Sequence, residues 1–127
     1  MMTYVKLISE QEAEGEIKAT YEQVKQVTGG AVPTTFQAMA NHPEYMKMVL
    51  QKMQTVMGSP ELPKSTKLAI AYAVSVLNNC EMCITMYSQQ LKAAGFTDKQ
   101  LVEIISVIDL VGSMNHFNNG MLIKPEK

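Results

Sequence analysis

The sequence predicts an all-α protein, a single compact domain of about six helices that spans residues 1–127. Apolar residues recur at three- and four-residue intervals through nearly the whole chain. Glycines, prolines and capping residues divide the chain into segments of helical length. We find no stretch in which apolar and polar residues alternate, as they would in a half-buried strand. Helices that pack on helices are the architecture that this pattern favours.

The first half of the chain predicts three helices. Ser9 and Glu12 match a capping box at the start of the first helix, and Gly29-Gly30 ends it. Pro33 opens a short second helix, which Asn41-His42-Pro43 interrupts, with His42 interpreted as a turn residue. Pro43 then opens a third helix.

The third predicted helix ends near Gly58-Ser59-Pro60 and carries a methionine-rich stripe on one face. The stripe consists of Met46, Val49, Leu50, Met53 and Met57. Methionine is a flexible apolar side chain that fills irregular gaps. We therefore interpret the stripe as core or subunit interface rather than as a metal site.

The second half predicts three more helices. Residues 62–77 form one with a wide apolar arc, which predicts a central position, and a further helix ends at Gly95. Thr97 and Gln100 match a second capping box, and the last helix runs from Asp98 to about Asn119. This last helix is apolar nearly all round, which is typical of a helix that is central or shared with another subunit.

Composition excludes several classes of protein. Apolar residues make up 46% of the chain and charged residues 18%, which is ordinary for a globular domain. The net charge of −1 gives no indication of a nucleic-acid or membrane partner. The first sixteen residues carry four glutamates and do not resemble a signal peptide, and the uncharged stretch 68–77 is too short to cross a bilayer. We therefore expect a cytoplasmic protein.

Cys80 and Cys83 are the two cysteines of the chain, and their spacing is the strongest indication of chemistry. Two thiols three residues apart can close a reversible disulfide within one helical turn, and the thiolate is the reactive form. Asn78 and Asn79 are good N-cap residues, which would place Cys80 in the first turn of a helix. There the free amide groups and the helix dipole favour an anion.

Two other interpretations of the pair stay open at this point. A CxxC pair can supply half of a structural zinc site, but such a site requires four ligands. The chain has no second CxxC, and His42 and His116 are far apart in sequence. The two cysteines can also be buried simply as small apolar side chains.

Several stretches together resemble the AhpD-like alkylhydroperoxidase / carboxymuconolactone decarboxylase family. The stretches are Glu12-Ala13-Glu14-Gly15-Glu16-Ile17, Val32-Pro33-Thr34-Thr35-Phe36, Asn41-His42-Pro43-Glu44-Tyr45, Leu77-Asn78-Asn79-Cys80-Glu81-Met82-Cys83, Ala93-Ala94-Gly95-Phe96-Thr97-Asp98 and Asn115-His116-Phe117-Asn118. The resemblance implies an all-helical fold that assembles into trimers or hexamers. It also implies peroxide reduction through the CxxC pair, which the decarboxylase branch generally lacks.

The full peroxidase motif of that family is similar to E-x₁₁-C-x-H-C-x₃-H, in which a glutamate and two histidines relay protons to the thiols. Both cysteines match, as Cys80 and Cys83. The glutamate position is Leu68 here, and the two histidine positions are Met82 and Tyr87. Every relay position therefore departs from the pattern, and the mechanism does not transfer whole.

Other residues are candidates to replace the relay. Tyr87 lies one helical turn after Cys83 and can donate a hydrogen bond to its thiolate, or it can cap the edge of the core. Glu81 lies between the cysteines, either as a replacement base or as an exposed partner of the helix dipole. Asp109 and His116 lie on one face of the last helix, and we interpret them as a buried polar pair rather than as a catalytic base.

The sequence therefore predicts a thiol oxidoreductase in which Cys80 and Cys83, assisted by Tyr87 or Glu81, reduce a small hydroperoxide or a partner disulfide. It needs an external thiol reductant but no metal or organic cofactor, and the cysteine that attacks stays unassigned. The alternatives are a redox-sensing or binding protein without peroxidase activity and a lactone decarboxylase-like enzyme. The chain contains no arginine, which disfavours the last because a carboxylate substrate usually requires a cationic partner. We also expect a homo-oligomer, a trimer or hexamer.

Overall fold

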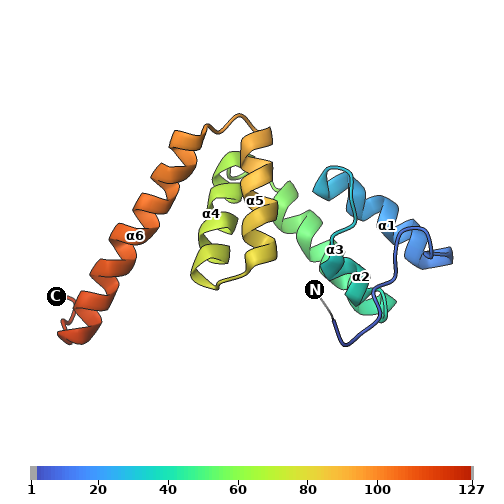
Figure 1. Ribbon diagram of the computed structural model, residues 1–127, viewed down its shortest axis with the longest axis horizontal. Helices are drawn as coiled ribbons and strands as arrows, with labels where there is room; N and C mark the ends of the chain where they lie inside the picture. Colours follow the sequence, from blue (N-terminus) through green and yellow to red (C-terminus); the bar gives the residue numbers. More distant parts are fainter. Residues whose placement is uncertain (1–2, 127) are drawn as a thin grey trace. The chain divides into compact units, whose positions relative to one another are not determined.

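The computed structural model describes residues 3–126. Within this range the chain forms six α-helices and no strand, which confirms the predicted all-α class. The chain divides into two compact units, the first ending at Ser59 and the second beginning at Pro60 (Figure 1). None of the helices among the described residues is long and apolar enough to cross a membrane.

The first unit contains helices α1 (Gly15–Thr28), α2 (Thr34–Met39) and α3 (Pro43–Gly58). Both α1 and α2 pack against α3. The core they enclose consists of Ala13, Tyr21, Val24, Val32, Phe36, Ala40, Met46 and Leu50, with Ile8, Ile17, Val27, Met39, Val49 and Met53 packed around it. Four residues of the methionine-rich stripe of α3 therefore lie in or against the core of this unit, and Met57 is not among them. Gly29 ends α1 in a left-handed conformation, as predicted.

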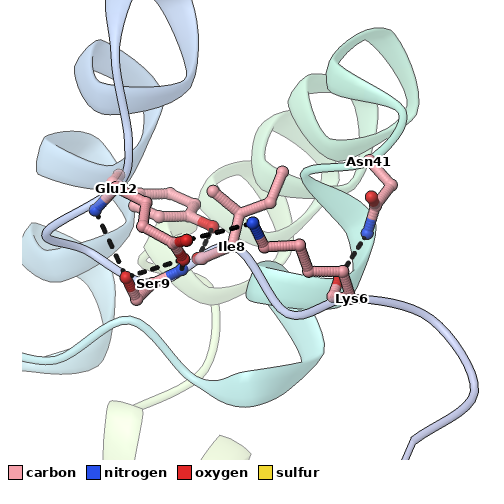
Figure 2. Close-up of polar contacts among 6 residues, drawn as sticks. Lys6, Ile8, Ser9, Glu12 and Asn41 are labelled. Atoms are coloured by element: carbon pink, nitrogen blue, oxygen red, sulfur yellow. Dashed lines mark hydrogen bonds and ion pairs between the residues drawn. The ribbon is translucent and has the colours of Figure 1, made fainter.

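The segment before α1 differs from the prediction. Ser9 and Glu12 do exchange hydrogen bonds as in a capping box, from the Ser9 amide to the Glu12 carboxylate and from the Glu12 amide to the Ser9 hydroxyl (Figure 2). However, they close an isolated turn, and α1 begins only at Gly15. Gly15 has a φ of 57°, which a right-handed helix does not contain, so the turn and α1 are separate elements.

The same segment is fixed to the first unit by hydrogen bonds from three elements. The buried Tyr21 hydroxyl of α1 donates to the Ile8 carbonyl at 2.7 Å. The Ile8 amide donates to the Gln37 carbonyl of α2. The Asn41 side chain donates to the Lys6 carbonyl at 2.7 Å, as Figure 2 shows. The segment is therefore an integral part of this unit.

The second unit contains α4 (Lys64–Leu77), α5 (Glu81–Ala93) and α6 (Asp98–Gly120). Helix α4 packs against both α5 and α6, so it is the central helix of this unit, as its wide apolar arc predicted. Leu68, Tyr72 and Ser75 of α4 and Leu91 of α5 are buried. The capping box of Thr97 and Gln100 at the start of α6 is confirmed, with both reciprocal hydrogen bonds present.

Helix α6 is not central, which corrects one of the two interpretations of its apolar surface. None of its residues is buried within the described chain. Its exposed large apolar residues include Val102, Val107, Leu110, Val111, Met114 and Phe117. Asp109 and His116 are exposed as well, so the predicted buried pair of these two residues is wrong for this chain.

Candidate active site

The cysteine pair lies at the turn that joins α4 to α5. Helix α4 ends with two hydrogen bonds that reach back across its last turn, from the Asn79 amide to the Val76 carbonyl at 3.1 Å and from the Cys80 amide to the Ser75 carbonyl at 3.0 Å. Asn79, the first of these two donors, adopts the left-handed region, with a φ of 58°. This is the Schellman arrangement, in which one left-handed residue stops a helix and satisfies its last carbonyl groups.

Asn79 rather than glycine occupies the left-handed position, because asparagine is the residue after glycine that adopts this conformation most readily. The sequence predicts Asn78 and Asn79 as N-caps of the following helix. Instead, Asn78 is the C-cap of α4 and Asn79 turns the chain. The N-cap of α5 is Cys80 itself.

Cys80 acts as an N-cap through its sulfur atom. The Cys83 backbone N–H donates to Cys80 Sγ at 3.4 Å, so the sulfur satisfies one of the free amide groups at the start of α5. The Cys80 carbonyl in turn accepts from the Ile84 amide at 2.8 Å, the first backbone hydrogen bond of the helix. Cys80 therefore lies just outside the first turn of the helix rather than within it, where the sequence analysis had placed it.

Cys80 and Cys83 are joined by a disulfide, and their Cα atoms are 5.3 Å apart. Both residues are only partly buried, so the pair does not behave as two small apolar residues enclosed in a core. Among residues 3–126, no group of three or more His, Cys, Asp or Glu side chains gathers as it would around a metal ion. The two sulfur atoms are thus positioned to form and break a bond with each other.

The residues at the relay positions differ from those of the complete motif in chemistry and in burial. Leu68 is buried in α4 with 2% of its surface exposed. Met82 is partly buried in the first turn of α5, and Tyr87 is partly buried further along the same helix. Leu68 and Met82 carry no ionisable group, and Tyr87 carries a phenol hydroxyl where the motif has a histidine.

The other candidate residues lie in different settings. Glu81 is the first residue of α5 and is exposed, as expected of an acidic partner of the helix dipole. His42 is more than a turn residue, because its Nδ1 accepts the Tyr45 amide at 3.2 Å and caps α3 in the first unit. The catalytic roles of Cys80, Cys83, Tyr87 and Glu81 stay predictions.

Two contributions to the site escaped the sequence analysis. One is the left-handed turn at Asn79, for which the Asn-Asn pair before Cys80 was a usable signal, since asparagine favours both caps and left-handed turns. The other is the Cys83 amide as a donor to Cys80 Sγ. No pattern of residue types indicates that bond, because it depends on which residue becomes the N-cap.

Comparison with known proteins relates this arrangement to one family. The profile of the carboxymuconolactone decarboxylase family matches residues 43–123, which is more than half of the chain. The alkyl hydroperoxide reductase AhpD of Methylocella silvestris is 32% identical over 78 residues, which cover 61% of this chain and 44% of that protein. The protein of the same name from Bradyrhizobium diazoefficiens is 33% identical over 66 residues, which cover 52% of this chain and 36% of that protein.

The matches therefore span less than half the length of these two relatives. A solved structure matches more fully. The crystal structure of the alkylhydroperoxidase AhpD core from Rhodospirillum rubrum has a TM-score of 0.91 to this chain at 28% sequence identity. The match covers 99% of this chain and 96% of that one.

Proposed function

Because the chain belongs to the carboxymuconolactone decarboxylase family, we propose that it is a thiol-dependent oxidoreductase of the alkylhydroperoxidase type. In this proposal Cys80 and Cys83 cycle between dithiol and disulfide while they reduce a hydroperoxide or a partner disulfide. The observation that carries the proposal is the cysteine pair, joined across the start of α5 and only partly buried. An external thiol reductant restores the dithiol after each turnover.

The proposed cycle needs no metal or organic cofactor. With a hydroperoxide, a thiolate attacks the terminal oxygen, the O–O bond breaks, and an alcohol leaves after it takes up a proton. The resulting sulfenic acid condenses with the second thiol, which forms the disulfide and releases water. With a partner disulfide, two exchange steps give the same oxidised pair. Two electrons pass from the thiols to the substrate in both cases.

A second candidate function rests on the relay positions. Leu68 and Met82 carry no ionisable group and Tyr87 carries a phenol hydroxyl, so these positions hold no carboxylate or imidazole to relay protons. Such a site with an intact cysteine pair is also what a redox sensor or binding protein would have. A protein of that kind forms its disulfide without fast turnover. The two functions differ in whether substrate is consumed repeatedly when an external dithiol is supplied.

One measurement separates these possibilities. The reduced protein is treated with one equivalent of hydrogen peroxide or of hydroxyethyl disulfide, and its free thiols are counted over time. The proposed function predicts loss of both thiols, an intramolecular Cys80–Cys83 link in mass spectrometry, and continued substrate consumption when a dithiol reductant is added. A sensor predicts the link without sustained turnover. Two intact thiols, or only intermolecular links, contradict both.

A further inference from the structure

The two cysteines of the pair are not equivalent in their surroundings. Cys80 Sγ is the N-cap acceptor of α5 and accepts the Cys83 backbone N–H at 3.4 Å. Cys83 contributes its backbone N–H to this contact, and its own sulfur belongs to a residue within the first turn of α5. When the disulfide is reduced, a thiolate at Cys80 retains an amide donor and the positive end of the helix dipole, whereas one at Cys83 lies within the first turn without that donor.

Charged side chains near the pair do not reverse this difference. Glu81 follows Cys80 directly, and its negative charge opposes a neighbouring thiolate. However, Glu81 is exposed, so water and salt screen its charge. They weaken the hydrogen bond from the Cys83 amide to Cys80 Sγ less. Glu81 also lies between the two cysteines in sequence, so its charge acts on both thiolates.

The leaving group of the substrate then decides which substrate suits the site. When a hydroperoxide is attacked, the departing alkoxide is strongly basic and must receive a proton from a nearby acid. The relay positions hold Leu68, Met82 and Tyr87, so they lack the carboxyl and imidazole groups that would serve as the proton donor in the complete motif. A disulfide releases a thiolate instead, which is stable at about pH 8.5 and above and leaves readily without a proton donor.

From these observations we infer that Cys80 is the attacking thiol and that its substrate is a disulfide rather than a hydroperoxide. The inference rests on the proposed function and assigns its substrate class. The Cys80 thiolate attacks one sulfur of the substrate disulfide, a mixed disulfide forms, and one substrate thiolate leaves. Cys83 loses its proton to solvent and attacks Cys80 Sγ, which releases the second substrate thiolate. The substrate disulfide gains two electrons, and the pair becomes the disulfide seen here.

The role of Cys80 is tested with two single-cysteine variants, Cys83→Ser and Cys80→Ser. We expect both variants to fold. Cys83→Ser retains the backbone N–H that caps α5, and in Cys80→Ser the serine is itself a good N-cap. Each variant reacts with the uncharged probe 4,4′-dithiodipyridine at neutral pH, once folded and once unfolded in urea. The unfolded rate corrects for the intrinsic reactivity of each thiol.

We expect Cys80 in the Cys83→Ser variant to react at least about fivefold faster folded than unfolded, because the fold stabilises its thiolate. We expect Cys83 in the Cys80→Ser variant to react more slowly folded than unfolded. A folded-to-unfolded ratio for Cys83 that equals or exceeds that of Cys80 overturns the assignment. In that case the disulfide still forms in the wild-type protein, so the proposed function survives.

The substrate class is tested on the reduced wild-type protein with both thiols present. The rate of dithiol loss is measured with hydroxyethyl disulfide and with hydrogen peroxide, each folded and unfolded in urea. We expect the fold to accelerate the disulfide reaction at least about tenfold more than the peroxide reaction. Equal or greater acceleration of the peroxide reaction overturns the inference but supports the proposed peroxidase. If the fold accelerates neither, the proposed function itself fails.

Discussion

At the scale of single residues, Cys80 links the end of α4 to the start of α5 through its amide, its carbonyl and its sulfur. Its amide donates to Ser75 and completes the end of α4, and its carbonyl accepts from Ile84 and begins α5. Its sulfur accepts from Cys83 and caps α5. These contacts hold the Cys80 side chain in position before the thiolate forms. Little conformational freedom is then lost on reaction, as expected of a preorganised nucleophile.

The first prediction concerns the relay positions. We expect the triple variant Leu68→Glu, Met82→His and Tyr87→His to raise the rate of peroxide reduction, by up to about 10²–10⁴-fold, since that is the usual contribution of general acid–base catalysis. The rate is measured as peroxide consumption with excess dithiol. If the unmodified protein already consumes peroxide as fast as a relative with the complete motif, another residue supplies the proton, and Glu81 and His116 are the first to substitute.

The triple variant can be tested only if the fold tolerates a carboxylate at the buried position 68. Leu68 is 2% exposed, so Leu68→Glu alone places a carboxylate in the core and should destabilise the fold by about 3–5 kcal/mol if it stays unpaired. Leu68→Met, which changes little volume, should cost less than about 1.5 kcal/mol and serves as the matched control. Urea unfolding monitored by circular dichroism measures both. Equal stability of the two variants would show that position 68 tolerates a charge.

The second prediction concerns Glu12 and the acid stability of the first unit. Hydrogen bonds from the Ser9 amide, and then from Lys6 and the Ser9 hydroxyl, lower the pKa of Glu12 from its ordinary value of 4.5 to about 2. Because the folded pKa is depressed, the stabilisation is fully present above pH 4.5 and is lost as the pH falls toward about 2. We expect Glu12→Gln to lower the unfolding free energy at neutral pH and to differ less from wild type as the pH falls through this window.

The measurement for Glu12 is urea unfolding at several pH values. Glu103→Gln is the matched control, because Glu103 is an exposed carboxylate on α6 without an ion pair among those described for residues 3–126. The Glu10 carboxylate is held in a similar way, since its hydrogen bond with Lys25 at 2.8 Å lowers its pKa. A difference between wild type and Glu12→Gln that does not shrink in acid would contradict the prediction.

At the scale of helices and turns, local signals predicted most elements but not every boundary. The capping box of Thr97 and Gln100 begins α6, whereas the similar pair of Ser9 and Glu12 closes only an isolated turn. The two pairs make the same hydrogen bonds. The difference comes from Gly15, the first residue of α1, whose left-handed backbone separates the turn from the rest of the helix. A capping signal at Ser9 carries no information about a residue six positions later.

The candidate site shows the same limit. The spacing of Cys80 and Cys83 indicated a bond between them, and the structure joins them. The sequence also placed them at the start of a helix. It did not reveal that Asn79 belongs to the end of α4, because asparagine is equally suited to an N-cap and to a left-handed C-terminal turn. Only the hydrogen bonds from Asn79 and Cys80 back to α4 decide between these possibilities.

The third prediction follows from that turn. With a φ of 58°, Asn79 adopts a conformation that costs most residues about 1–2 kcal/mol. We therefore expect Asn79→Ala to lower the unfolding free energy by about 1 kcal/mol, and Asn79→Gly, the matched control, to preserve or raise it. Urea unfolding measures both effects. Since the turn positions Cys80, Asn79→Ala should also slow the reaction of Cys80 with a disulfide probe. Equal stability of the two variants would contradict the strain argument.

At the scale of the whole molecule, α6 contacts α4 but lacks the buried apolar face that usually stabilises a helix. Helices in proteins depend mainly on tertiary contacts of an apolar face rather than on their own propensity. Helix α6 has 23 residues and none of them is buried within the described chain. Its exposed apolar residues continue past its end, where Met121, Leu122 and Ile123 are also exposed. Apolar surface gathered in this way is typical of an interface.

The last prediction is that this surface is covered by further copies of the same chain. We propose a symmetric homo-oligomer, a trimer or a multiple of three, as the family resemblance implies, and light scattering at micromolar concentration measures its mass. Leu110 is 56% exposed in the single chain, so Leu110→Glu would change the stability of a monomer by only about 0.5 kcal/mol. In an oligomer it buries a charge in the interface and should dissociate the assembly. Glu103→Gln, an exposed polar change on the same helix, should leave the mass unchanged. A monomer mass for the unmodified protein contradicts the proposal, because α6 would then be stable without a partner.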